Sequence, residues 1–204
     1  MMQAAPASGA GALIGPNAIL QTVAILDRYE GRGMRDRVMA RAAVPMPDGT
    51  AMIPEGQAAA MHRAVHVELP DRSEGLLRLA GLATGDYILR HRIPRLARLL
   101  IRALPAPLAA RVLAVAIEKH AWTFVGSGSF RVTPGRPLIF EVRDNPLRDP
   151  DGHPCVWHAA VFERLFQRLV WPACAVREVE CIAAGGALCR FEVWPKGWDC
   201  APAS

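Results

Sequence analysis

Cysteine and histidine supply the side chains of this 204-residue chain that are best suited to metal chemistry. Cys155 and His158 lie three residues apart on one face of an expected helix, and Cys181 and Cys189 are expected to meet across a hairpin. Because thiolate and imidazole are preferred zinc ligands, these four residues could form a tetrahedral site. The chain has no Cys-x-x-Cys pair, and free cysteines often pack as small hydrophobic side chains, so inert buried thiols are the alternative.

A second set of histidines is spaced for ligation along expected helices. His62 and His66 are one helical turn apart, which suits ligation of a metal or axial ligation of a bound chelate. No third ligand lies near them in sequence, so a partly buried structural pair is the alternative. His91 and His120 each end an expected helix, where interaction with the helix dipole gives them a structural role.

Three glycines interrupt an expected helix over residues 73–91. A glycine in a helix interior costs about 1 kcal/mol relative to alanine, so these positions need a compensating gain. Gly81 and Gly85 lie one turn apart and form a smooth stripe with Ile88. The stripe predicts either a second helix packed very closely or a flat ligand lying against it.

The glycine-rich segment at 126–130 does not have the pattern of a nucleotide site. It lacks the third glycine of a dinucleotide fingerprint, and the chain contains no Walker sequence and no Gly-x-Ser-x-Gly elbow. A reductase needs a source of hydride or electrons. The sequence therefore offers no evident nicotinamide or flavin site, and a turn is expected here.

Composition argues against several classes of protein. Lys and Arg number 24 against 19 Asp and Glu, but the arginines are scattered, so no nucleic-acid surface is expected. The most apolar stretch, residues 99–117, contains Arg102 and Arg111 and cannot span a bilayer. The first sixteen residues lack the positive region of an export signal, so we expect a cytoplasmic protein with reduced thiols.

Apolar periodicity predicts the elements that position these groups, helical up to about residue 120 and strand-like afterwards. The expected helices cover residues 17–30, 34–43, 54–66, 73–91, 96–102, 105–119 and 155–170, and the expected strands cover 122–125, 130–132, 138–143, 175–183 and 187–194. The helix at 105–119 is apolar all round, which predicts burial on every side. The predicted fold class is α+β, with a helical N-terminal half packed on an antiparallel sheet and one further helix.

The domain organisation follows from the same patterns. We expect one domain over residues 16–195, with a helical part at 16–120 and a sheet with one helix at 121–195. A flexible N-terminal tail at 1–15 and a C-terminal tail at 196–204 are expected to flank it.

The register of the last hairpin can be predicted from its hydrophobic pattern. A three-residue loop at 184–186 pairs Cys181 with Cys189 and Val179 with Phe191. A two-residue loop would mix the two faces, because a slip of one residue turns every side chain over. We therefore expect the two sulfur atoms to lie side by side on the buried face.

Several segments together carry a family resemblance. They are residues 87–94, 120–130, 143–147, 157–166 and 179–193, and the most specific piece is Glu180-Cys181 followed by Gly185 and Cys189-Arg-Phe191. Over residues 15–195 the chain resembles the 4-vinyl reductase domain family. The resemblance implies a fold similar to haem-based nitric-oxide sensors and Golgi trafficking subunits, with a ligand cavity between helices and sheet. It also suggests a metal at Cys155, Cys181 and Cys189.

The resemblance further implies a role in bacteriochlorophyll synthesis. The leading hypothesis is a non-catalytic carrier that holds a Mg-porphyrin or divinyl protochlorophyllide for pathway enzymes such as Mg-chelatase. The alternatives are an 8-vinyl reductase that uses an external reductant, and an assembly factor for a pathway enzyme. By analogy with the trafficking subunits a homodimer is expected, located in the cytoplasm or at the periphery of the photosynthetic membrane.

A tetrapyrrole needs a slot with apolar walls for its faces and basic groups for its carboxylates. Its faces are expected to lie against Trp122, Phe124 and Trp157, besides Ile88 and the glycine stripe. The residues expected to meet its carboxylates are Arg90, Arg92 or Arg95. The axial ligand of magnesium is expected to be a water molecule or one of the histidines His62, His66, His91, His120 and His158.

Overall fold

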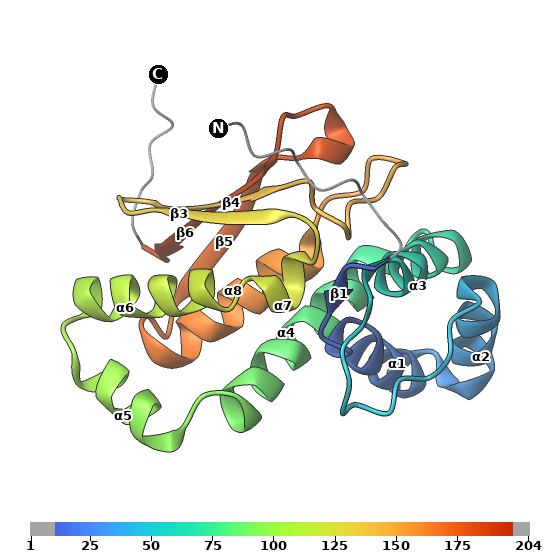
Figure 1. Cartoon of the computed structure of the whole chain (residues 1–204), viewed down its shortest axis with the longest axis horizontal. Coiled ribbons are helices and arrows are strands. Elements are labelled where there is room, and N and C mark those ends of the chain that lie inside the picture. The colour runs from blue at the N-terminus through green and yellow to red at the C-terminus, as the bar shows by residue number, and fades with distance from the viewer. Residues whose placement is uncertain (1–10, 198–204) are drawn as a thin grey trace.

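The structure, a computed structural model, describes residues 11–197 of the chain. Its helices are α1 (Asn17–Tyr29), α2 (Gly31–Ala42), α3 (Glu55–Glu68), α4 (Ser73–His91), α5 (Arg95–Ala103), α6 (Ala106–Lys119), α7 (Trp122–Val125) and α8 (Val156–Leu169). Its strands are β1 (Leu13–Ile14), β2 (Ile53–Pro54), β3 (Ser129–Thr133), β4 (Leu138–Arg143), β5 (Cys174–Glu180) and β6 (Cys189–Pro195). Helices thus precede an antiparallel sheet that has one long helix inserted, which confirms the predicted α+β class (Figure 1).

Strands β3, β4, β6 and β5 form an antiparallel sheet in that order. Along β4, Leu138, Phe140 and Val142 are buried and alternate with partly exposed neighbours, as expected for a strand with one covered face. Helix α8 supplies Phe162 and Phe166, whose ring centroids lie 5.0 and 5.8 Å from that of Phe140. The apolar core of this half therefore lies between α8 and the sheet.

Helix α4 packs along α8 more closely than larger side chains would permit. A Cβ atom on Gly81 would lie 2.8 Å from the Cβ of Ala160, and one on Gly85 would lie 2.6 Å from the Cβ of Arg164. Glycine is needed where two backbones approach this closely. Close helix packing, one of the two expected alternatives, is therefore the role that the structure gives Gly81 and Gly85, and α8 covers the face expected to receive a ligand.

Residues 122–125 form a short helix, so the strand expected there is wrong. The backbone N–H groups of Phe124 and Val125 both donate to the carbonyl of Ala121 at 2.9 Å, so the chain turns directly after α6. Aromatic and β-branched residues favour strands in general, but the tertiary setting of a segment overrides such propensities. The turn buries Val125 and leaves Trp122 59% exposed.

Helix α6 is buried on one side only, so the burial expected all round it is wrong. Leu113 and Ile117 face the protein, whereas Leu108 and Val115 are exposed. An apolar sequence allows burial on every side, but it takes neighbours on every side to produce it. Among the helices of residues 11–197, none has both the length and the apolar composition needed to cross a bilayer.

The N-terminal tail expected at 1–15 is partly structured. Leu13–Ile14 form β1, which pairs with β2 in an antiparallel ladder, and Ile14 is buried. The remaining parts of the expected tails, residues 1–10 and 198–204, lie outside the described residues. The single ligand-binding domain over 16–195 stays a prediction.

The final hairpin keeps the predicted register beside its turn and departs from it by one residue beyond a bulge. Phe191 faces Glu178 and Arg190 faces Glu180, so Val179 is an extra residue of β5 without a partner. Such a bulge shifts the alternation of side chains by one position. Because directly paired residues share a face of the sheet, Glu178 lies on the covered face with Phe191.

The sulfur atoms of this hairpin meet nevertheless. β5 ends at Glu180, so Cys181 does not pair with Cys189 in a ladder but leads into a 3₁₀ turn at Ile182–Ala184. The two Sγ atoms lie 3.9 Å apart. The predicted proximity of the sulfur atoms is confirmed, and the predicted register holds at Glu180 and Arg190 but is wrong beyond the bulge at Val179.

Candidate functional site

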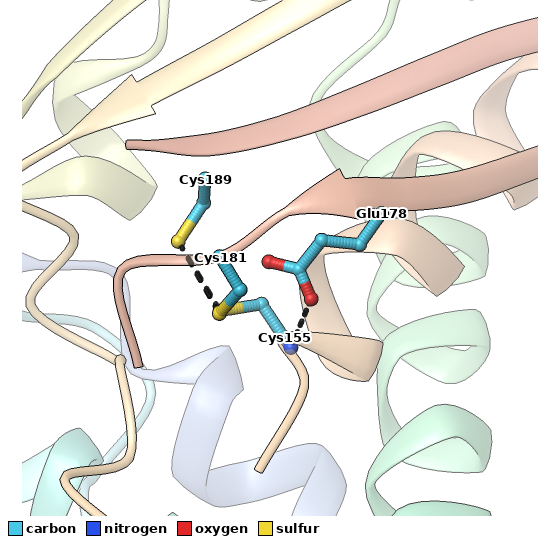
Figure 2. A group of neighbouring side chains, drawn as sticks. All are labelled: Cys155, Glu178, Cys181 and Cys189. Carbon is cyan, nitrogen blue, oxygen red and sulfur yellow. Dashed lines mark hydrogen bonds between the residues drawn. The ribbon is translucent and has the colours of Figure 1, made fainter. Parts of the chain in front are cut away.

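Three cysteine sulfur atoms and one carboxylate meet before the first turn of α8, and we call this group the sulfur cluster (Figure 2). The Sγ of Cys155 lies 3.6 Å from that of Cys189 and 3.9 Å from that of Cys181, and the Sγ atoms of Cys181 and Cys189 are 3.9 Å apart. Zinc–sulfur bonds of about 2.3 Å in a tetrahedral site place two sulfur ligands roughly 3.8 Å apart. The triangle therefore has the size that a zinc ion requires.

Glu178 supplies the fourth ligand atom of the cluster. The three sulfur atoms and a carboxylate oxygen of Glu178 all lie within 4.8 Å of one another. The backbone N–H of Cys155 donates to Oε2 of Glu178 at 2.7 Å, which holds the carboxylate beside the sulfur atoms (Figure 2). His158, which the sequence offered as the fourth ligand, lies outside the cluster, with its Nε2 3.5 Å from the carbonyl oxygen of Phe124.

Hydrogen bonds and burial shift the proton affinities within the cluster in opposite directions. Hydrogen bonds from the thiols of Cys155 and Cys181 lower the pKa of Cys189 to about 4. The hydrogen bonds of Cys155 with Cys181 and Cys189, together with burial, raise the pKa of Cys155. Burial raises the pKa of Glu178 to about 7. Cys189 therefore becomes a thiolate, the form that binds metals, more readily than Cys155.

Asn145 orients two of the sulfur atoms through hydrogen bonds. Its Nδ2 donates to the Sγ of Cys155 at 3.2 Å and to the Sγ of Cys189 at 3.6 Å. Its Oδ1 accepts a hydrogen bond from the backbone N–H of Leu147 at 3.0 Å, which fixes the direction of the amide. Outer groups of this kind orient ligands and tune their basicity in metal sites.

Sequence reasoning missed both Glu178 and Asn145. Glu178 stands beside Val179 in an alternating run, where the pattern favours a charged side chain on the exposed face. The bulge at Val179 reverses that assignment. The available signal was the position of an acidic residue three places before Cys181, and a second acid, Glu180, made that signal ambiguous.

A second group of buried side chains lines a small cavity between α3, the 147–154 loop and α8, and we call it the histidine seam. Of the residues predicted to bind a ligand, four line it: His62, His66, Trp157 and His158. The cavity has a volume of about 20 Å³, room for about one water molecule. Ligand pockets usually have about 300–1,000 Å³. The slot expected here is thus wrong, because side chains of the two layers fill it.

Burial keeps the imidazoles of the seam neutral. It lowers the pKa of His62 to about 3, lowers that of His158 to about 4 and lowers that of His66. His62 Nε2 lies 3.3 Å from the carbonyl oxygen of Ala18, and His66 Nδ1 lies 2.9 Å from Oγ of Ser73. Each of these two rings therefore already has a partner within the protein.

Aromatic rings fill the rest of the seam. The centroids of His62 and Trp157 lie 5.7 Å apart, and Phe124 lies 6.0 Å from His158. The Nε1 of Trp157 is buried and has no hydrogen-bond partner among residues 11–197. A buried donor of this kind usually bonds to water or a ligand.

A larger groove opens where α6 meets the sheet. Its volume is about 380 Å³, within the range of ligand pockets. Trp171, Trp194 and the turn at 134–138 line it, together with Arg111 from α6. No residue predicted from the sequence to touch a ligand is among the described residues that line this groove.

The other predicted residues do not come together. His91 and Arg92 are exposed at the end of α4, and Ile88 is partly buried one turn earlier. His120 and Trp122 are exposed beyond α6, where Nδ1 of His120 lies 2.8 Å from a backbone carbonyl oxygen of that helix. This contact at a helix end is the structural role that the sequence gave as an interpretation of His120.

Residues 140–195 match the family model of the 4-vinyl reductase domain. The chain is 58% identical over 187 residues to the bacteriochlorophyll synthase 23 kDa chain of Rhodobacter capsulatus, a match that covers 90% of this chain and 88% of that protein. It is 57% identical over 188 residues to the protein of the same name from Cereibacter sphaeroides, a match that covers 90% of this chain and 91% of that protein.

Solved structures share the fold at low sequence identity. An unliganded Fe(II) H-NOX protein mutant from K. algicida has a TM-score of 0.60 and 12% identity, covering 89% of this chain and 96% of that one. An H-NOX protein from S. oneidensis in the Fe(II)NO state also gives 0.60, with 9% identity and coverage of 90% and 99%. The phenol-responsive domain of PoxR, solved with phenol, gives 0.51, with 16% identity and coverage of 81% and 92%. The predicted similarity to nitric-oxide sensors is confirmed for the fold.

The family match and the geometry fall on the same part of the chain. All four ligand residues of the sulfur cluster lie within residues 140–195. The two relatives are more than half identical along nine-tenths of the chain and contain few residues beyond the match. The chain belongs to the family of the bacteriochlorophyll synthase 23 kDa chains, and the resemblance to the 4-vinyl reductase domain family that its sequence carries is confirmed.

Proposed function

We propose that the chain binds a tetrapyrrole intermediate of bacteriochlorophyll synthesis and carries it between enzymes without changing it. The names of its two relatives support a place in that pathway. The likeness to folds solved with Fe(II), nitric oxide or phenol supports binding of a small molecule. The observation that carries the proposal is the groove of about 380 Å³ between α6 and the sheet.

The groove has the chemistry that a Mg-porphyrin or divinyl protochlorophyllide requires. Trp171 and Trp194 offer flat apolar rings to a flat macrocycle, while Arg111 can bind its carboxylates with paired hydrogen bonds. Because the groove is open, one edge of the macrocycle can enter while the other stays accessible. That arrangement suits a carrier that must deliver its cargo to an enzyme such as Mg-chelatase.

The histidine seam is a less favourable place for the pigment. A macrocycle could enter it only if α3 and α8 separated, because the cavity there holds about 20 Å³. Separation would break the buried contact between His62 and Trp157. The groove needs no such rearrangement, so we assign the pigment to the groove.

Titration of the purified chain with Mg-protoporphyrin tests the assignment. We expect a saturable shift of the Soret band together with quenching of tryptophan fluorescence. Trp194→Leu and Arg111→Gln should each weaken binding by about five- to thirtyfold, because each removes a wall or a charged contact worth about 1–2 kcal/mol. The matched control is Trp122→Leu, which removes an exposed tryptophan outside the groove and should leave the affinity unchanged.

Three results would overturn parts of the proposal. A titration without a saturable shift would exclude pigment binding. Weakening by Trp157→Phe but not by Trp194→Leu would move the pigment to the histidine seam. Loss of the 8-vinyl absorption signature, with turnover, when divinyl protochlorophyllide is incubated with NADPH or reduced ferredoxin would replace the carrier with a reductase.

We further propose that the sulfur cluster holds a structural zinc ion. Its four protein ligands are Cys155, Glu178, Cys181 and Cys189. Four protein ligands leave no position for a substrate, which is the arrangement of structural rather than catalytic zinc sites. The ion would fix the start of α8 against the hairpin of β5 and β6, so its contribution is to folding.

A further inference from the structure

Helix α5 turns its apolar side away from the protein. Leu96, Leu99 and Leu100 are 68%, 63% and 60% exposed, whereas Ile101 is buried. The three leucines fall within one arc of the helix, on the side away from Ile101. In Figure 1, α5 lies at the outer edge of the molecule, below α6. This outward apolar face is unlike that of an ordinary surface helix, which turns such a side to the core.

Helix α6 repeats this feature. Leu108, Val112 and Val115 follow one another at helical spacing and are exposed, on the side opposite the buried Leu113 and Ile117. Helices α5 and α6 follow one another in the chain and contact each other. We call these two outward faces the α5–α6 surface, which is defined by six residues: Leu96, Leu99, Leu100, Leu108, Val112 and Val115.

Positive charge accompanies the α5–α6 surface. Residues 90–119 contain one acidic residue, Glu118, whose carboxylate accepts a hydrogen bond from the backbone N–H of Val132 at 2.9 Å. The cations of the same segment are Arg90, Arg92, Arg95, Arg98, Arg102, Arg111 and Lys119. Within residues 11–197, none of these cations lies in an ion pair with an acidic side chain.

Several arginines on other elements are paired with acids. Arg72 pairs with Glu30 at 2.8 Å, and Arg78 pairs with Glu163 at 2.7 Å. What sets residues 90–119 apart is their composition, with seven cations against one acid. This excess of cations indicates a negatively charged counterpart for the α5–α6 surface.

We propose that the α5–α6 surface lies on an anionic lipid bilayer. Leucine and valine side chains can enter the boundary between headgroups and acyl chains, while arginines extend their aliphatic stems and bind lipid phosphates. Each basic residue near an anionic membrane contributes about 1 kcal/mol, so several act together. A bilayer also accepts two protruding helices without a matching concave surface.

A second copy of the chain fits this surface less well. In a twofold contact the same patch meets itself, so the arginines of one copy would face those of the other. Like charges placed opposite one another oppose association. An acidic protein would satisfy the charge, but it would also need a concave apolar site for α5, whereas a bilayer does not.

Flotation of the purified chain with pigment-free vesicles tests this proposal. We expect binding to vesicles of phosphatidylcholine with phosphatidylglycerol, weakened by added salt, and little binding to phosphatidylcholine alone. The double variant Leu99→Ser/Leu100→Ser should bind at least about tenfold more weakly. Arg95→Gln should bind about fivefold more weakly. The matched control is Leu13→Ser, which removes a leucine 47% exposed in β1 and should change nothing.

The possible outcomes separate the proposal from its competitors. Equal binding to both kinds of vesicle, binding to neither, or unchanged binding of the leucine variant would overturn it. Self-association that Leu99→Ser/Leu100→Ser abolishes, without vesicle binding, would assign the surface to a second copy. Because the vesicles contain no pigment and Leu99 and Leu100 lie outside the groove, the leucine variant should bind Mg-protoporphyrin normally, so the two proposals fail independently.

Discussion

The sulfur cluster and the histidine seam both adjoin the start of α8, yet their side chains are arranged differently. Cys155 precedes α8 and joins the cluster, while Trp157 and His158 lie in the first turn of α8 and line the seam. In the cluster, four potential ligand atoms converge within 4.8 Å of one another. In the seam, the imidazoles of His62 and His66 each have a partner elsewhere in the protein.

This difference separates side chains arranged to bind a metal ion from side chains that pack against one another in the core. Thiolates and a carboxylate that converge on one point repel one another when no cation is present. A bound cation removes this repulsion, so such a group is stabilised mainly by the ion. Rings that already share hydrogen bonds and contacts gain their stability from the fold itself. Residue type alone did not distinguish these cases, since both groups consist of ligand-forming side chains.

Removing the metal should give the largest effect of those expected here. Cys181→Ser, or treatment with a chelator, should abolish a stoichiometric zinc content and lower the free energy of unfolding by at least about 5 kcal/mol. Metal analysis combined with thermal unfolding measures both changes. Cys174→Ser is the matched control, because Cys174 is buried but outside the cluster, so it should keep its zinc. A protein that contains no zinc and is indifferent to chelator would show that the cluster is only packed thiols.

Substitution of Gly81, at the contact of α4 with α8, should lower the free energy of unfolding by an intermediate amount. The Cβ atom in Gly81→Ala would press on Ala160 and on the backbone of Trp157, which should destabilise the protein by about 3 kcal/mol, measured by urea unfolding. Gly75→Ala is the control in the same helix, where nothing lies within 4 Å, and it should stabilise by about 0.5–1 kcal/mol. Equal effects of the two changes would mean that α4 does not need the close contact.

Acid should lower the free energy of unfolding, because His62 takes up a proton when the chain unfolds. Its pKa is about 3 in the folded chain against 6.5 unfolded, so the unfolded chain binds more protons between these values. Stability that is present above pH 6.5 is therefore lost as the pH falls, by about 2 kcal/mol at pH 5. In His62→Gln this part of the pH dependence should disappear, while the contributions of His66, His158 and Glu178 remain in both proteins.

Chemical unfolding at pH 7 and pH 5 measures that difference. The quantity to compare between the two proteins is the change in the free energy of unfolding from pH 7 to pH 5. A packing defect caused by the substitution lowers the free energy of unfolding at both pH values, so it does not affect this difference. An identical pH dependence of the free energy of unfolding in the two proteins would show that His62 is accessible to protons in the folded state. The seam would then open more readily than its packing indicates.

Much of the fold could be predicted because the signals are local. The apolar periodicity of α1, α4 and α8 and the alternation along β4 depend only on neighbouring residues. The short segment 122–125 was mistaken for a strand because its residues favour strands, while its position directly after α6 makes it a turn of helix. Local propensity decides long elements more reliably than short ones.

The sequence by itself determined the classes of the long elements, the close approach of α4 to α8 as one of two choices, and the meeting of Cys181 with Cys189. Only the tertiary structure decided that Glu178 joins them, because one unpaired residue, Val179, shifts the alternation of β5. It also decided that the histidines pack together while a groove opens elsewhere. Periodicity fixes which side of an element is apolar, but the space left between elements depends on how all their side chains pack together.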